Sequence, residues 1–107
     1  MIVTTSENIP GYRVTRVLGL TFGLTVRSRG VGGNMAAGFK SLVGGEIRSY
    51  TKLLEDARRE AVDRLVENAT AMGANALVMM RFDSSEMGQT MSEIVAYATA
   101  MVVEPAA

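Results

Sequence analysis

One long amphipathic segment constrains the fold of this chain more than any other feature. Residues 45–73 read GEIRSYTKLLEDARREAVDRLVENATAMG, and their apolar residues recur at helical spacing. Charged residues occupy the opposite side, and Gly73 follows the last apolar residue, as is common after a helix C-terminus. We therefore predict a helix over about 46–72 that packs against a sheet. The residues that share its narrow core-facing arc are Leu54, Ala61, Leu65 and Met72.

Two features distinguish this segment from a simple surface helix. Val62 and Val66 widen the apolar arc beyond what one sheet face covers. Arg58 falls near the middle of the arc, where an unpaired charge costs several kcal/mol unless its stem reaches solvent. We predict a snorkelling or ion-paired arginine at a subunit contact, with a ligand-binding role as the alternative.

Alternating and apolar runs predict three or four strands around the helix. Residues 2–5 read as a short edge strand, ended by the turn signal Pro10-Gly11. Residues 12–26 alternate apolar residues with threonine and glycine, and residues 77–82 are apolar on both faces. A polar loop through about Met91 separates the third strand from the last one, over 92–104.

The predicted class is α+β, with a small antiparallel or mixed sheet. Asn34 is a plausible N-cap for a short helix over about 34–43, which Gly44-Gly45 ends before the long helix begins. A length of 107 residues fits a single domain over 1–107.

Both faces of the last predicted strand are apolar, and one helix covers only one of them. Its run of alanines would allow a close approach of the helix, whereas Val95, Tyr97, Met101 and Val103 on the other face need another cover. We predict that a neighbouring subunit supplies it. The predicted contact residues are Arg58, Val62, Val66, Val95, Tyr97 and Met101.

The composition excludes much chemistry. The chain has no cysteine and no histidine, so thiolate and imidazole ligands and Ser-His or Cys-His catalytic pairs are absent, and we predict no enzyme. Eleven basic and eleven acidic residues cancel, which gives no overall field for nucleic acid or an anionic membrane. No signal peptide or membrane span is apparent, so a soluble cytoplasmic protein is predicted.

A glycine-rich stretch is the candidate anion or ligand site. GVGGN over 30–34 follows a predicted strand and could form a backbone nest for a phosphate or carboxylate. It lacks the Walker Lys-Ser/Thr pair and the full dinucleotide spacing, and the alternative is a glycine-rich corner where subunits approach. The candidate residues are Arg27, Arg29, Gly32, Gly33 and Asn34.

The sequence identifies no cofactor, but a bound metal ion is one hypothesis. Asp83, Glu86 and Glu93 surround the last loop and offer oxygen ligands for a hard cation, although solvated carboxylates are the alternative. Thioethers select copper(I), but methionine is also common core filler. The methionines concerned are Met79, Met80, Met87 and Met91.

Four runs, taken in order, resemble the YbjQ-like family of small bacterial and archaeal proteins of undetermined function, often labelled "putative heavy-metal-binding". They are GLTVRSRGVGG, LVGGEIRSYTKLLEDARREAVDRLVENA, MGANALVMMRFD and SEIVAYATAMVVE. The resemblance covers nearly the whole chain and implies an α+β subunit that assembles into a ring, commonly a pentamer. Ala98 departs from the family pattern, which often has glycine there, and its methyl group should tighten packing.

These observations lead to two function hypotheses. The first is a homo-oligomeric assembly or small-ligand-binding module without catalytic activity. The alternative is a cation- or metal-binding protein that uses carboxylate ligands, with thioethers as an additional option.

Overall fold

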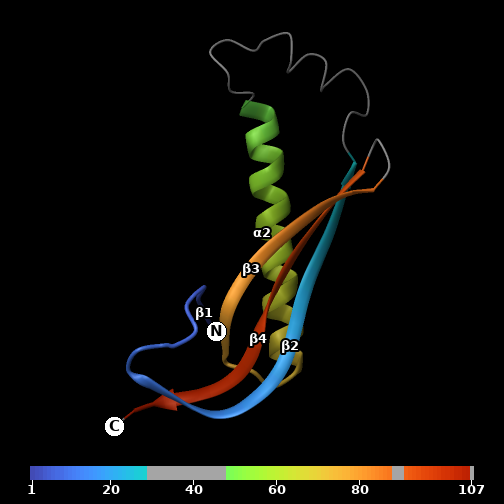
Figure 1. The fold of residues 1–107 in the computed structure, drawn as a ribbon. Helices are drawn as coiled ribbons and strands as arrows, with labels where there is room; N and C mark the ends of the chain where they lie inside the picture. The colour runs from blue at the N-terminus through green and yellow to red at the C-terminus, as the bar shows by residue number, and fades with distance from the viewer. Residues whose placement is uncertain (29–47, 88–90, 107) are drawn as a thin grey trace.

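A computed structural model describes residues 1–28, 48–87 and 91–106 as a four-stranded mixed sheet with one helix (Figure 1). The α+β class is therefore confirmed. The short helix predicted over about 34–43 lies outside the described residues. The elements are β1 (Ile2–Val3), β2 (Tyr12–Ser28), α2 (Arg48–Ala71), β3 (Ala76–Met87) and β4 (Met91–Pro105).

The sheet has the strand order β1-β3-β4-β2. β4 pairs antiparallel with both β3 and β2, and the short β1 pairs parallel with β3. The 17-residue β2 therefore forms one edge of the sheet over its whole length. The polar loop predicted from Asp83 was wrong: residues 83–87 continue β3, because their backbones pair with the start of β4.

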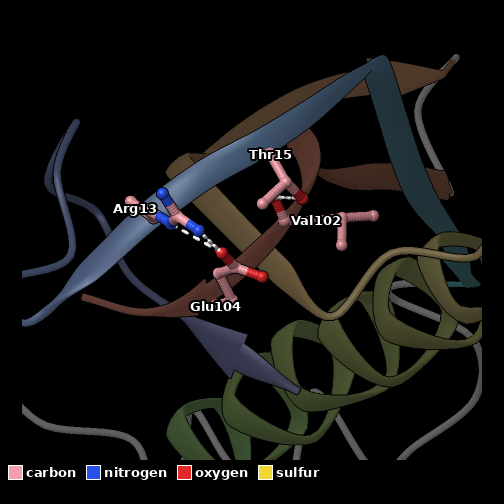
Figure 2. Close-up of polar contacts among 4 residues, drawn as sticks. All are labelled: Arg13, Thr15, Val102 and Glu104. Carbon is pink, nitrogen blue, oxygen red and sulfur yellow. Dashed lines mark hydrogen bonds and ion pairs between the residues drawn. The ribbon is translucent and has the colours of Figure 1, made fainter. Parts of the chain in front are cut away.

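Three β-bulges interrupt the pairing, two in β2 and one in β3. Thr15 is the extra residue of the first, and its hydroxyl donates a hydrogen bond of 3.1 Å to the carbonyl of Val102 (Figure 2). Beside it, Arg13 Nε donates to Glu104 Oε1 at 2.6 Å. Because bulges bend a strand and increase its twist, they account for the strong curvature of the sheet in Figure 1.

α2 packs on the sheet face that carries the small residues. Ala57, Ala61, Leu65 and Ala69 are buried in one core cluster with the β4 alanines Ala96, Ala98 and Ala100. The predicted stripe is thus confirmed in its middle. It was wrong at its ends, since Leu54 is 48% and Met72 38% exposed. Burying a side chain such as Leu65 contributes roughly 1.5–3 kcal/mol.

Two side chains of α2 also reach the free edge of β2. Arg64 Nη1 donates to the carbonyl of Leu24 at 2.6 Å, and Asn68 Nδ2 donates to the carbonyl of Phe22 at 2.7 Å. Unpaired edge groups otherwise invite another strand to add to the sheet. Two carbonyl groups of this edge are therefore bonded to helix side chains and are not available to another strand.

A second core cluster lies on the opposite sheet face, near the N-terminal segment. Val78, Met101 and Val103 are buried there, with Ile2 and Ile9 packed against them. The expectation that Met101 and Val103 need cover from another subunit was wrong, because the chain's own first residues cover them. This N-terminal segment is held against β3 by strand pairing of β1 and by a hydrogen bond of 2.9 Å from the N–H of Thr4, just after β1, to the Leu77 carbonyl.

Candidate functional site: the open sheet face

The remainder of that face forms an exposed apolar surface, which we call the open face. On β2, Thr21, Gly23 and Thr25 turn toward α2, so the intervening side chains point to the opposite side. Leu20 is 68% and Phe22 55% exposed. The open face consists of Leu20, Phe22, Leu24, Val26, Val95 and Tyr97.

Strand pairing brings these residues together. Phe22 lies directly opposite Tyr97, and Leu24 lies opposite Val95, so each pair shares one face of the sheet. Tyr97 is 38% exposed although β4 is a central strand. The alternation in the sequence identifies the apolar side of β2, but it does not indicate against which side of the strand the helix packs.

The close approach of α2 to Gly23 explains why the helix packs on this side of β2. A Cβ at this position would lie 2.2 Å from the carbonyl oxygen of Ala61 and 2.3 Å from the amide nitrogen of Leu65. Only glycine at this position of the strand admits the helix backbone this closely. The larger apolar residues of β2 are consequently left on the other side.

Of the residues in the predicted anion site, the structure describes Arg27 alone. Its guanidinium forms an ion pair with Glu60, which also pairs with Arg64 one helical turn on. The charge of Arg27 is therefore already balanced by a carboxylate from α2. The other members of that prediction, Arg29, Gly32, Gly33 and Asn34, lie outside the described residues.

The predicted metal ligands do not form one cluster within the described chain. Glu93 lies opposite Ser85, whereas Glu86 lies opposite Ser92, so Glu86 and Glu93 project from opposite faces. Asp83 lies opposite Val95, so it projects to the same side of the sheet as Glu93, at the border of the open face. Among the residues that the structure describes, no group of three or more acidic side chains is placed to hold a metal ion.

The candidate methionines lie at two separate places on the sheet. Met79 is 40% exposed at the β3 bulge, while the neighbouring Met80 packs against the core under α2. Met91, at the start of β4, lies directly opposite Met87 at the end of β3. A thioether site would need ligands from more than one of these places.

The helix residues predicted at a subunit contact are described but carry no direct evidence of a partner. Val62 and Val66 are half-buried against the core cluster. Arg58 is exposed, and its guanidinium carbon lies 5.3 Å from the centre of the Phe82 ring. Their role at a contact stays a prediction.

Fold and surface together define a small sheet-and-helix protein whose most distinctive exposed feature is an apolar sheet face. The chain belongs to the YbjQ family, whose model, described as "Putative heavy-metal-binding", matches residues 1–104. Among the residues that the structure describes, no helix is both long and apolar enough to cross a membrane.

Curated relatives extend this assignment across bacteria and archaea. A UPF0145 protein of Bradyrhizobium sp. (strain ORS 278) is 69% identical over 106 residues, covering 99% of this chain and 96% of its own. A UPF0145 protein of Picrophilus torridus is 57% identical over 105 residues, covering 98% and 89%.

A solved structure agrees in fold. The crystal structure of a Pediococcus pentosaceus protein of unknown function, from the DUF74 family, superposes with a TM-score of 0.64 at 14% identity. The match covers 97% of this chain and 98% of that one. It supports the arrangement of sheet and helix.

Proposed function

We propose that the protein is a non-catalytic homo-oligomer whose subunits associate through the open face. The observation that carries this proposal is the group of large apolar side chains on one side of β2, headed by Leu20 and Phe22. Contiguous exposed apolar surface of this kind is typical of protein interfaces. The aromatic pair Phe22 and Tyr97 gives it the composition common at binding hot spots.

The proposed assembly is a closed ring, with a pentamer as the expected form, located in the cytoplasm. A ring joins two different surfaces of each subunit, so the open face would meet another part of the next copy. The balanced charge of the chain supports self-association over binding to nucleic acid or an anionic membrane.

The test is a charge placed in the centre of the open face. Phe22→Glu should lower the mass measured by sedimentation velocity to that of a single subunit, because a buried carboxylate without a partner is costly. Leu54→Glu is the matched control, since Leu54 is also an exposed apolar residue but lies on the helix side. If both variants sediment like the wild type, the open face is not the contact surface.

Metal binding is the second candidate, and the family description favours it. This chain supplies no thiolate or imidazole, so the donors would be carboxylates, with thioethers as an additional option. Asp83 and Glu93 lie on one side of the sheet, at the border of the open face, where a second subunit could add ligands. Calorimetric titration of metal-stripped protein with zinc, copper(I), calcium and nickel tests this, and no binding below high-micromolar concentration would remove it.

A further inference from the structure

A pocket on the helix side of the sheet has the lining of a small-molecule site. Its volume is about 390 Å³, and it lies between the first half of α2 and the hairpin of β3 and β4. In Figure 1 the hairpin end of β3 and β4 leans away from the first turns of α2. The volume falls within the usual range for ligand pockets.

The pocket has an apolar side and a polar side. Ile94, 4% exposed, contributes to it from β4, and Leu54 from α2. Ser84 lies directly opposite Ile94 in the sheet, and Ser92 is two residues before Ile94, so their hydroxyls share its face. A bound molecule would therefore meet hydrocarbon and hydroxyl groups together.

Arg58 supplies the positive charge of the lining. The Phe82 ring lies 5.3 Å from its guanidinium carbon, which orients the group while leaving its N–H donors available. Within the described residues no carboxylate forms an ion pair with Arg58, in contrast to Arg27 and Arg64. Glu86 also lines the pocket and has an interaction of its own.

From this lining we infer that the pocket binds a small carboxylate with an apolar body. The guanidinium of Arg58 pairs with the carboxylate, the serine hydroxyls complete its hydrogen bonds, and the hydrocarbon part contacts Leu54 and Ile94. This inference goes beyond the proposed function, because the pocket and the open face lie on opposite sides of the sheet.

Titration of ¹⁵N-labelled wild-type protein with hexanoate, 4-methylpentanoate and phenylacetate, followed by NMR, tests it. We expect saturable shifts at the amides of Ser84, Ser92 and Ile94 with at least one acid, and none with hexylammonium. No saturation by any acid up to the millimolar range overturns the inference. Equal binding of hexylammonium also overturns it.

Variants separate recognition by Arg58 from general surface binding. Arg58→Gln should weaken carboxylate binding roughly 10-fold or more, as expected when a charge-assisted hydrogen bond is lost. Arg59→Gln, the neighbouring exposed arginine outside this pocket, should leave it unchanged. Equal binding by the two variants contradicts the assignment of Arg58.

A pocket-filling variant provides an independent check. Leu54→Trp should block carboxylate binding while the sedimenting mass stays that of the wild type, because Leu54 is half exposed and lies outside the open face. Undiminished binding by Leu54→Trp would place the carboxylate elsewhere. Because mass and binding are measured separately, failure of this inference is distinguishable from failure of the proposed assembly.

Discussion

The backbone of Ala61 in α2 approaches Gly23 of β2 so closely that a methyl group at Gly23 would lie 2.2 Å from the Ala61 carbonyl oxygen. The helix therefore rests on strand backbone at this point instead of on side chains. This contact fixes the helix on the glycine and threonine side of β2 and leaves Phe22 and Leu24 on the open face.

Gly23→Ala should destabilise the protein by at least about 3 kcal/mol, at the upper end of overpacking effects, because the clashing atoms are backbone. Gly19→Ala is the comparison: its φ of +111° disfavours a side chain, but nothing lies within 4 Å of the added methyl group. We expect Gly19→Ala to cost only roughly 1–2 kcal/mol. Urea unfolding at one fixed protein concentration measures both, and equal losses would contradict the close contact.

The β3 bulge makes a second prediction, at Met79. Its φ of 56° lies in the left-handed region, which asparagine tolerates and β-branched residues avoid. At this 40% exposed position Met79→Asn should melt at a higher temperature than Met79→Val. That order reverses the usual strand preference for valine. A more stable valine variant would show that the backbone at Met79 is not left-handed.

The ion pairs of Glu60 give a third prediction. Glu60→Gln removes its pairs with Arg27 and Arg64, both partly exposed, so the loss of stability should be about 1 kcal/mol and should shrink in high salt. Glu67→Gln, on the exposed side of α2, is the control and should change stability by less than about 0.5 kcal/mol. An undiminished difference in high salt would argue against an electrostatic origin.

Much of the fold follows from local sequence pattern. The helix predicted over about 46–72 is observed over Arg48–Ala71. It ends just before Gly73, as predicted, and Gly73 has a φ of +88°. The strands begin within one residue of their predicted positions, because alternation and turn residues act locally. The family assignment also followed from the sequence runs.

The errors arise from contacts between distant segments. Nothing near Met101 in the sequence indicates that Ile2 and Ile9 cover it. Similarly, Asp83 and Ser84 resemble a loop locally, and only their pairing with β4 makes them a strand. The helical angle of Leu54 predicts a core position, but its side chain is 48% exposed and lines a pocket with Ile94 instead.

The candidate sites were less predictable than the fold. The sequence showed that Arg58 was unusual for its position, but its place above Phe82 and beside Ser84 depends on how α2 sits over the hairpin. The carboxylates Glu86 and Glu93 are close in sequence and in register, yet a strand's alternation separates them onto different faces.

Self-association through the open face is the central claim, and sedimentation equilibrium of the wild-type protein tests it most directly. At micromolar concentration we predict a single oligomeric species with a mass of two or more times the 11.4 kDa subunit. The Phe22→Glu substitution should dissociate this species. A folded, concentration-independent species of 11.4 kDa would contradict the claim.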